Sequence, residues 1–398
     1  MNKWILKKIF RRVMSTLPMW SHRLLTKKKI LQLSEHLMTI EDLELCEKNI
    51  EKRDMMVIQY KQRFPKATKV LERKIEELIQ HNPLVMDLPD LDETIKDIEF
   101  CWFGYGFHPD EYMFYQLGGE NKLPQKRRMF VSEQERVCFR FSVNDFSDPL
   151  LSDKADVYKK FNEYYKRNAL PIEKKTSIEE LKSFLCDKTE FVQKYVSSSR
   201  GQAVELVQIR DIEISKYLDE LKAKGKFLLE DRIIQSECLN VYGSSLHNIR
   251  VSTFRTKQGI IPICGFFTIG TEGTFVVNAT IGCVFASIDC KTGLIESGGC
   301  DELGNRYDIH PSSGLKIKGF QLPDWDGAIR ICIEVASKLD NFAYVSFDLA
   351  HTVNGWDIIE INPSGQLLHQ AANLIGFRRE LNRIVENMEQ ITPYKLRK

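Results

Sequence analysis

Three side chains with oxygen ligand atoms, Asp348, Glu360 and Asn362, lie within one short stretch near the end of the chain. Two runs rich in β-forming residues flank Asn354-Gly355 there, and this dipeptide is a strong mark of a β-hairpin. Two carboxylates and an amide on one face would repel one another without a cation between them, and hard oxygen ligands suit Mg²⁺. The stretch therefore predicts a divalent-metal site.

The register of this hairpin decides whether the three side chains share a face. A two-residue turn that pairs residue 353 with 356 sets Asp348 on the other face from Glu360. A three-residue loop with Gly355 in the left-handed conformation pairs 352 with 356, 348 with 360 and 346 with 362. We expect this second register. The alternative, a solvated polar face, is disfavoured by apolar neighbours at Phe347, Leu349, Ile359 and Ile361.

A second candidate for chemistry is Lys194, at the end of an apolar run that precedes Ser197-Ser-Ser-Arg-Gly201. The hydroxyls and backbone N–H groups of such a loop can cover phosphates, while the lysine supplies positive charge. The residues of the loop that we assign to phosphate are Ser198, Arg200 and Gly201. An ordinary surface loop is the alternative.

A third candidate is the apolar run that ends in Glu230 and continues to Glu237. Its apolar side chains, from Leu228 to Ile233, could hold an adenine ring. The carboxylates could accept hydrogen bonds from ribose hydroxyls.

These candidates depend on elements that must fold together. The sequence predicts a helix over about 153–167, a hairpin of 191–196 with 203–207, a helix near 212–224 and a strand over 226–230. An antiparallel sheet is expected over 251–289, where β-rich runs alternate with glycine turns. Asp324 begins a predicted helix with one apolar face.

The first part of the chain is expected to be helical. Residues 31 to about 85 predict two or three helices, one of which ends before Pro65. Residues 87–92 are predicted to form a linker. The aromatic-rich stretch 98–145 is interpreted as a mixed element whose aromatic side chains are core rather than a binding platform.

The candidate features follow one another along the chain in a definite order: a lysine on a strand, a Ser/Gly loop, a strand ending in Glu, an antiparallel sheet and then Asp…Glu-x-Asn. This order resembles the ATP-grasp superfamily. The run Asn248–Thr253, with Gly298-Gly299, His310-Pro311 and Gly319–Trp325, is similar to the sugar-transfer-associated ATP-grasp group, found among surface-polysaccharide biosynthesis proteins. The resemblance covers about residues 100–385. It implies an α+β class and an ATP-grasp fold, in which two α+β subdomains clasp a nucleotide, here with an N-terminal helical extension.

The resemblance also implies a role for each matching residue. Two lysines would contact the nucleotide, two glutamates the adenine and ribose, and one arginine the γ-phosphate or acyl-phosphate. The cofactors would be ATP and one or two Mg²⁺, with Mn²⁺ as a substitute. The lysines are Lys154 and Lys194, the glutamates are Glu230 and Glu237, and the arginine is Arg250. The metal ligands would be Asp348, Glu360 and Asn362, and the catalytic candidates are Arg250 and Lys194.

The implied reaction is a ligation. A carboxylate attacks the γ-phosphate of ATP, and an amine or thiol then attacks the acyl-phosphate, so that ADP and phosphate are released. No GxSxG, Walker or HExxH motif indicates a competing chemistry. His247 and His310 are candidate acceptor-site residues, with a structural role as the alternative, and Arg255 is a candidate carboxylate clamp.

The partners would be a carboxylate donor and an amine acceptor, with a sugar or a lipid-linked glycan as candidates. Two other functions stay open. One is a sugar or small-molecule kinase on the same fold, and the other is a non-catalytic nucleotide-binding scaffold in a glycan-assembly complex.

Charge divides the chain into two unequal parts. The sequence has 57 Lys+Arg and 55 Asp+Glu, but residues 1–30 hold nine basic side chains and no acidic one, so the remainder is acidic. Nucleic-acid binding is disfavoured by that acidic remainder. With 43% hydrophobic and 28% charged residues, the composition excludes a disordered chain. The ten cysteines include no CxxC pair, so we expect reduced thiols in a cytoplasmic protein.

The basic leader, residues 1–30, has apolar residues at helical spacing, with Ile5, Ile9, Val13 and Leu17 on one face. A basic amphipathic helix can lie in the headgroup region of an anionic membrane, so we expect a peripheral contact at the inner face. Packing of this helix on the acidic body is the alternative. The expected divisions of the chain are 1–30, 31–97, 98–150, 151–229, 230–385 and 386–398.

Overall fold

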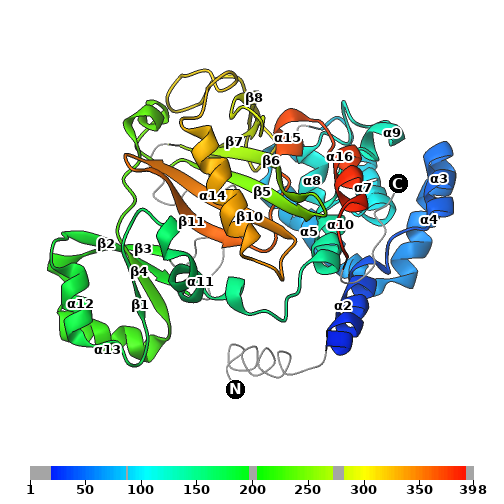
Figure 1. Cartoon of the computed structure of the whole chain (residues 1–398). Helices are drawn as coiled ribbons and strands as arrows, with labels where there is room; N and C mark the ends of the chain where they lie inside the picture. Colours follow the sequence, from blue (N-terminus) through cyan, green and yellow to red (C-terminus); the bar gives the residue numbers. More distant parts are fainter. Residues whose placement is uncertain (1–18, 87, 197–203, 272–281, 391–398) are drawn as a thin grey trace.

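A computed structural model describes residues 19–86, 88–196, 204–271 and 282–390. It contains two antiparallel sheets and a helical region built mainly from the first 145 residues (Figure 1). The small sheet lies at the lower left of Figure 1, the large sheet in the middle and the N-terminal helices at the right. Residues 1–18 of the leader lie outside the described residues, so the amphipathic helix expected there stays a prediction.

The small sheet has four strands in the order β1-β4-β2-β3. The helices α12 (Ile178–Leu185) and α13 (Ile214–Lys224) pack on it, and Leu181, Leu218 and Leu229 are buried between them. The predicted hairpin of 191–207 and the strand before Glu230 are confirmed. The strands are β1 (Ala169–Ile172), β2 (Glu190–Tyr195), β3 (Val204–Gln208) and β4 (Phe227–Glu230).

The large sheet has seven strands in the order β11-β10-β5-β6-β7-β8-β9. Helix α14 (Trp325–Ser337), the helix predicted after Asp324, packs on one of its faces through Ala328, Cys332 and Val335. The strands are β5 (Asn248–Thr256), β6 (Gly259–Gly270), β7 (Cys283–Ile288), β8 (Ile295–Cys300), β9 (Arg306–Tyr307), β10 (Tyr344–Thr352) and β11 (Gly355–Asn362).

Short helices lead from the N-terminal helices into the small sheet. Helix α11 (Lys154–Phe161) and the 3-10 turn η2 (Asn162–Tyr164) replace the longer helix predicted for 153–167. Asp153 caps α11 by accepting hydrogen bonds from the backbone N–H groups of Ala155 and Asp156. The chain then leaves the helix at Tyr165, because the following residues run into the small sheet.

The N-terminal helices pack on the other face of the large sheet. The aromatic side chains predicted as core are buried, and Phe103 and Phe107 share a cluster with Phe266 of β6 and Phe285 of β7. This stretch contains helices, turns and one isolated bridge at Asn144 but no strand, so its interpretation as a mixed element was wrong. The helices are α2 (Met19–Ser34), α3 (Ile40–Lys48), α4 (Ile50–Arg63), α5 (Pro65–His81), α6 (Pro83–Met86), α7 (Leu91–Tyr105), α8 (Pro109–Phe114), α9 (Pro124–Arg127) and α10 (Glu133–Val143).

Two short helices, α15 (His369–Asn373) and α16 (Arg378–Glu386), complete the C-terminal part. Within the described ranges, no helix is both long and apolar enough to cross a bilayer. All ten cysteines are free thiols, as their scattered spacing predicted.

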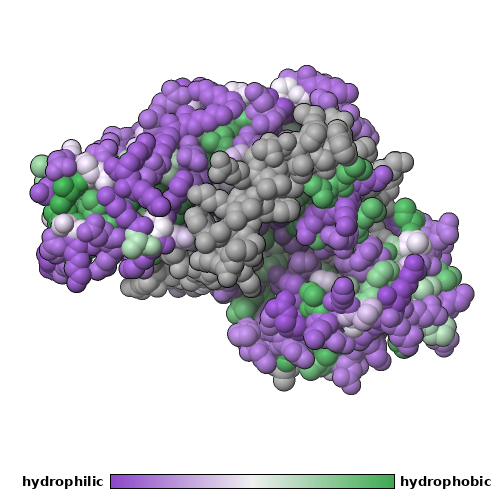
Figure 2. Space-filling model, turned by 90° about the horizontal axis from the view of Figure 1, so that it is seen from below, coloured by the Kyte–Doolittle hydropathy of each residue, from purple (hydrophilic) through white to green (hydrophobic). Residues whose placement is uncertain are grey.

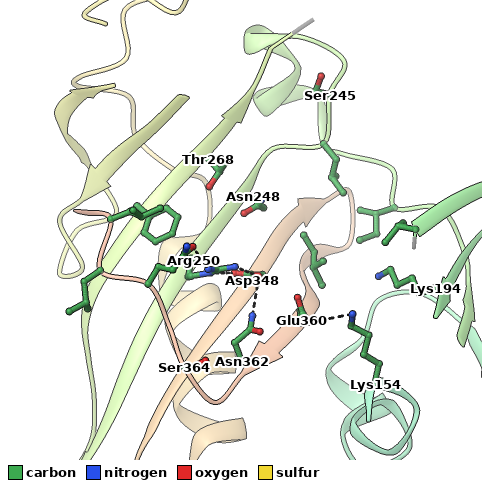
Figure 3. Close-up of a pocket in the computed structure, with 18 of the residues that line it drawn as sticks. Lys154, Lys194, Ser245, Asn248, Arg250, Thr268, Asp348, Glu360, Asn362 and Ser364 are labelled. Atoms are coloured by element: carbon green, nitrogen blue, oxygen red, sulfur yellow. Dashed lines mark hydrogen bonds and ion pairs between the residues drawn. The ribbon is translucent and has the colours of Figure 1, made fainter. Parts of the chain in front are cut away.

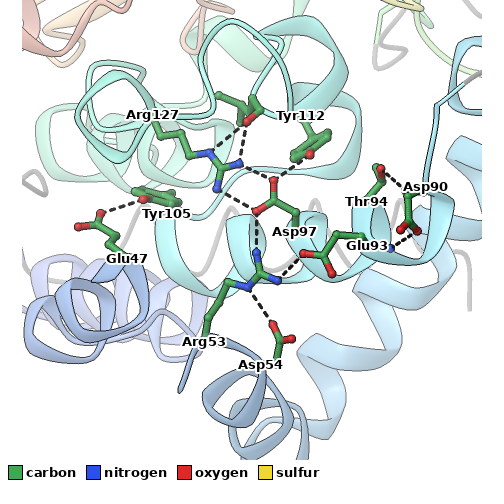
Figure 4. Close-up of polar contacts among 11 residues, drawn as sticks. Glu47, Arg53, Asp54, Asp90, Glu93, Thr94, Asp97, Tyr105, Tyr112 and Arg127 are labelled. Carbon is green, nitrogen blue, oxygen red and sulfur yellow. Dashed lines mark hydrogen bonds and ion pairs between the residues drawn. The ribbon is translucent and has the colours of Figure 1, made fainter. Parts of the chain in front are cut away.

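Asp97 is the polar centre of the N-terminal region (Figure 4). It is 4% exposed, accepts a 2.8 Å hydrogen bond from the Tyr112 hydroxyl, and forms a two-pronged ion pair with Arg127. Arg53 of α4 lies 3.6 Å away, so the carboxylate joins α4, α7 and α9. Helix α7 passes through the predicted 97/98 boundary without a break.

We predict that Asp97→Ala lowers the free energy of unfolding by about 3–5 kcal/mol, because it leaves the buried Arg127 guanidinium without its counter-charge. Urea unfolding measures this loss. Asp187→Ala, at a side chain that is 81% exposed, is the matched control and should change little. A loss below about 1 kcal/mol for Asp97→Ala would show that the carboxylate does not organise the region.

Candidate active site

One large cavity, about 1370 Å³, lies between the two sheets and the N-terminal helices. Figure 2 shows the hollowed lower face between the small-sheet part at the left and the helical part at the right. The lining of the cavity includes side chains from β2, β4, β5, β10 and β11, and also from α8 and α10. The cavity therefore lies where three separate parts of the chain meet.

Strand alternation places the candidate residues on the cavity face of the large sheet (Figure 3). In β10, Asp348 faces the cavity while its neighbours Phe347 and Leu349 are buried against the α14 side. In β5, Arg250 alternates in the same way with Ile249 and Val251. Of the apolar residues that argued against a solvated face, Phe347, Leu349 and Ile361 thus form the core beneath the site, whereas Ile359 lines the cavity.

The predicted cross-strand pairs are confirmed: Asp348 lies opposite Glu360, and Ser346 opposite Asn362. The predicted loop was wrong, however. Thr352 pairs with Gly355 across a two-residue turn, and Gly355 has φ +91°. An irregularity beside Asp348 then shifts the register by one residue, because Ile359 is an extra residue that bulges between the paired positions. The bulge restores the shared face that the sequence required.

Three acid–base pairs line the cavity. Figure 3 shows the pairs of Arg250 with Asp348 and of Lys154 with Glu360. The Arg250 guanidinium forms a two-pronged ion pair with Asp348, with Nη2 2.6 Å from Oδ2. Lys194 Nζ lies 2.5 Å from Glu230 Oε2, and Lys154 Nζ lies 3.4 Å from Glu360 Oε1. The structure therefore brings together Lys154, Lys194 and Arg250, three of the basic residues that the sequence assigned to ATP.

The oxygen-bearing set fits a divalent cation. Asp348, Glu360 and Asn362 project from two adjacent strands, and the Asn362 amide donates a 3.2 Å hydrogen bond to Asp348 Oδ2. The set has hard oxygen donors and no sulfur or imidazole, which suits Mg²⁺ or Mn²⁺ better than a softer metal. Arg250 and Lys154 supply the positive charge beside these carboxylates.

The environment of Lys194 and Glu230 differs from what the sequence indicated. Glu230 is 2% exposed and faces the lysine and Arg167 instead of open solvent. Burial acts to raise the pKa of Glu230, but Arg167 and Lys194 overcome it and hold this pKa below its ordinary value. Burial lowers the pKa of Lys194. Glu230 is therefore an ionised anchor for Lys194.

Arg167 is the site residue that sequence reasoning missed. Its side chain is 3% exposed and lies 3.0 Å from Glu230 of β4 and 2.8 Å from Asp357 of β11. It also donates a 2.8 Å hydrogen bond to the carbonyl of Ile358. Arg167 follows η2 in a polar stretch with no motif, so only the two distant acids, once folded together, mark its position.

The other nucleotide candidates divide into three groups. Ile233 lines the cavity with Val192, Val204 and Ile359, an apolar set where the sequence expected adenine. Glu237 is exposed at the start of the 3-10 helix η4 (Glu237–Tyr242) and is not among the described lining residues, so its assignment to ribose stays a prediction. Ser198, Arg200 and Gly201 lie outside the described residues.

Three candidates for the substrate side lie elsewhere. His247 and His310 are both 0% exposed and pack edge-on against the Tyr242 ring, outside the cavity. Burial lowers the pKa of His247 to about 4. Arg255 donates a 2.7 Å hydrogen bond to the carbonyl of Ala336, at the end of α14. The structural role is the correct one for both histidines, and the clamp role of Arg255 was wrong.

The chain after β11 folds back over the site through Gly365. A side chain at this position would meet the Ser346 hydroxyl at 1.7 Å, so only glycine allows this close approach. The turn brings Gln366 to Arg250, which donates a 2.9 Å hydrogen bond from Nη1 to the Gln366 side chain. Arg250 is thus held from two sides.

The two antiparallel sheets with a cavity between them are those of an ATP-grasp fold. The sugar-transfer associated ATP-grasp family matches residues 149–386. The chain belongs to this family. A comparison with curated proteins found no match.

Solved structures give low-identity likenesses. The ATP-grasp ligase PsnB with a minimal precursor has 10% identity and a TM-score of 0.38, covering 62% of this chain and 63% of that chain. D-alanyl-alanine synthetase A from Vibrio cholerae O1 biovar eltor has 12% identity and a TM-score of 0.38, with coverages of 61% and 66%. The Helicobacter pylori D-Alanine-D-Alanine ligase has 13% identity and a TM-score of 0.39, covering 64% of this chain and 68% of that chain. The chain spans slightly less than two thirds of the first two proteins.

We predict that the stabilising effect of Glu230 disappears at low pH. Because its folded pKa is lowered, the folded state binds this proton less tightly than the unfolded chain, so the stabilisation is present above the ordinary value of 4.5 and is lost as the pH falls below it. The difference in unfolding free energy between wild type and Glu230→Gln should therefore be large near pH 7 and shrink toward about pH 3 in urea titrations.

The control for this experiment is Glu220→Gln, at an exposed position on α13. Its free energy of unfolding should stay close to that of the wild type at every pH in the titration. A Glu230→Gln difference that is the same at both ends of the pH range would contradict the ionised state assigned to Glu230.

Proposed function

We propose that this protein is an ATP- and Mg²⁺-dependent ligase that joins a carboxylate to an amine through an acyl-phosphate, in surface-polysaccharide biosynthesis. Membership of the sugar-transfer associated ATP-grasp family supports the use of ATP and the link to glycans. The observation that carries the proposal is the convergence of Lys154, Lys194 and Arg250, from three elements, on one cavity with the oxygen set of β10 and β11.

The composition of the site supports transfer of a phosphoryl group without a covalent enzyme intermediate. Phosphoryl transfer needs positioning and charge stabilisation more than it needs a protein nucleophile. No cysteine is among the described residues that line the cavity, whereas Lys154, Lys194 and Arg250 are among them. The lining is therefore suited to holding a triphosphate and a second substrate.

The cavity has room for two substrates. Pockets for a single small ligand have volumes of roughly 300–1,000 Å³. The volume here, about 1370 Å³, exceeds that range. We assign the end near Val192 and Ile233 to the nucleotide base, and the end near α8 and α10 to the carboxylate substrate.

The chain's own residues bind and orient the reactants in this scheme. Mg²⁺, held by Asp348, Glu360 and Asn362, would neutralise phosphate charge when it is bound. Lys194 and Lys154 would contact phosphate oxygens, while Glu230, fixed by Arg167, keeps Lys194 in place. Arg250, supported by Gln366, would offset the charge of the transferred phosphoryl group.

The bonds made and broken follow from this placement. A carboxylate oxygen of the donor attacks the γ-phosphorus, and the bond to the bridging oxygen of ADP breaks. The amine nitrogen then attacks the acyl carbon, phosphate leaves with the electron pair of its C–O bond, and the amine proton is released. An amide, ADP and phosphate are the products.

We predict that Asp348→Asn lowers ATP turnover at least about 100-fold, because it removes one metal ligand and the anionic partner of Arg250. The assay supplies ATP, Mg²⁺, pooled amino acids and acidic sugars, with hydroxylamine to trap an acyl-phosphate as a hydroxamate. Wild-type protein should yield ADP and a hydroxamate in equal amounts.

Asp340→Asn, whose carboxylate is 88% exposed at the end of the α14 segment, is the matched control and should keep full turnover. ADP with a phosphorylated sugar and no hydroxamate would replace the ligase with a kinase. Tight ATP binding by the wild type without any ADP would instead indicate a scaffold.

We propose in addition that the leader brings the enzyme to an anionic membrane surface. Helix α2 supports this proposal: Leu24 and Leu31 are each 58% exposed, beside the exposed Lys27 and Lys28. Exposed leucines with flanking lysines match an interface of headgroups and acyl chains. A lipid-linked acceptor would be reached at such a surface.

Removal of residues 1–18 leaves all of α2 in place and tests this localisation. We expect the full chain to sediment with vesicles that contain phosphatidylserine, and the shortened chain to lose most of this binding. Raising the salt concentration should release the full chain, because attraction to the anionic headgroups is screened. Equal sedimentation of the two chains would assign the membrane contact to another surface or reject it.

A further inference from the structure

The end of the cavity opposite the nucleotide candidates is built by the N-terminal helices. Lys74 of α5, His108 and Glu111 at α8, and Glu133, Arg136 and Arg140 at α10 line the same cavity as Arg250. All six lie before residue 149, where the match to the family begins. This wall is therefore specific to the N-terminal region of the chain.

Arg136 and Arg140 are one turn apart on α10 and so project from the same side of the helix. Arg136 is 5% exposed and forms a two-pronged ion pair with Glu133, in which Nε lies 2.7 Å from Oε2. Its remaining nitrogen, Nη1, is buried and has no hydrogen-bond partner among the described residues. A buried guanidinium N–H without an acceptor is costly, so this nitrogen points to a ligand that would supply one.

Arg140 lacks a partner more completely. Its Nε is buried without a hydrogen-bond partner, and the guanidinium has no ion pair in the described part of the chain. Its flat face lies over Phe141 and Phe146, with the guanidinium carbon 5.0 Å and 5.6 Å from the ring centroids. Burial and the charge of Arg136 lower the pKa of Arg140, and the nearby carboxylate of Glu133 opposes this shift only in part.

The acids nearby do not neutralise this pair. Glu133 is engaged by Arg136, and the carboxylate of Glu111 accepts hydrogen bonds from the backbone N–H groups of His108 and Glu133. Burial, with repulsion from Asp110 and Glu133, raises the pKa of Glu111 well above its ordinary value, so it carries less negative charge than a free glutamate. Asp110 is exposed and forms no ion pair with either arginine among the described residues.

We propose that Arg136 and Arg140 bind an anionic group of the substrate that is ligated, at the end of the cavity away from ATP. This inference rests on the proposed ligase function, because it specifies the substrate as an acid with its anion held by the N-terminal helices. Paired guanidinium groups recognise planar carboxylates and phosphates through parallel N–H donors. The group is therefore either the carboxylate of a sugar acid or the phosphate of a phosphorylated acceptor.

The test measures anion binding without any need for turnover. Full-length protein is first saturated with Mg²⁺ and a non-hydrolysable ATP analogue, which occupies the triphosphate positions near Lys154, Lys194 and Arg250. Glutarate, as the carboxylate probe, and inorganic phosphate, as the phosphate probe, are then titrated separately by calorimetry at low ionic strength. We expect one of them to bind to wild type and the Kd to rise at least about tenfold in Arg140→Gln, the loss of one charged contact.

Matched variants separate binding from folding. Arg140→Lys should recover part of the affinity because it keeps the charge, whereas Arg383→Gln, at an exposed position of α16 with a side chain that is 75% exposed, should bind like wild type. The free energy of unfolding of Arg140→Gln, measured in urea, should equal or exceed that of the wild type, because the change removes repulsion between two cations. Stronger binding of glutarate identifies a carboxylate ligand, and stronger binding of phosphate identifies a phosphate ligand.

The proposal is overturned if neither probe binds, or if Arg140→Gln binds both probes as wild type does. This outcome differs from failure of the ligase function. Loss of anion binding in Arg140→Gln together with a wild type that forms no ADP would leave an acidic-ligand site on a protein that is not a ligase. ADP formation with an unaffected KM for the acid in Arg140→Gln would leave a ligase whose substrate is held elsewhere.

Discussion

The buried fork of Arg167 is the interaction on which the geometry of the site depends. One guanidinium contacts Glu230 of the small sheet and both Asp357 and the Ile358 carbonyl of the large sheet. Two acids from different sheets would repel each other without it, and their burial would be too costly to maintain. Because Glu230 in turn holds Lys194, the fork sets where the lysine of one sheet lies relative to the carboxylates of the other.

Patterns carried by neighbouring residues could be predicted from the sequence. Strand alternation, together with the expected pairing of 348 with 360, predicts the shared face of Asp348, Glu360 and Asn362. The turn was wrong although the pairing was right. An isolated hairpin does not reveal that a bulge at Ile359 can compensate for a shorter loop.

The remainder of the site depends on contacts between distant segments, which leave no local signal. Arg167 gains its role from acids about 60 and 190 positions further along the chain, and its own stretch contains no motif. The histidines near the sheet were plausible acceptor residues by type, but packing against Tyr242 buries them. The aromatic stretch predicted as core is core, yet the same helices also supply the arginines of the far cavity wall.

Charge pairing across the cavity explains how such a site can fold before a ligand binds. Lys154, Lys194 and Arg250 each face a carboxylate, so the nucleotide end is close to neutral. A metal–triphosphate complex can exchange with these internal partners, since its phosphates meet the cations while its metal meets the acids. The α10 end differs, because Arg140 has no ion pair among the described residues and aromatic rings hold it in place. Selectivity for an anion should therefore be greatest at that end, where binding displaces no internal carboxylate.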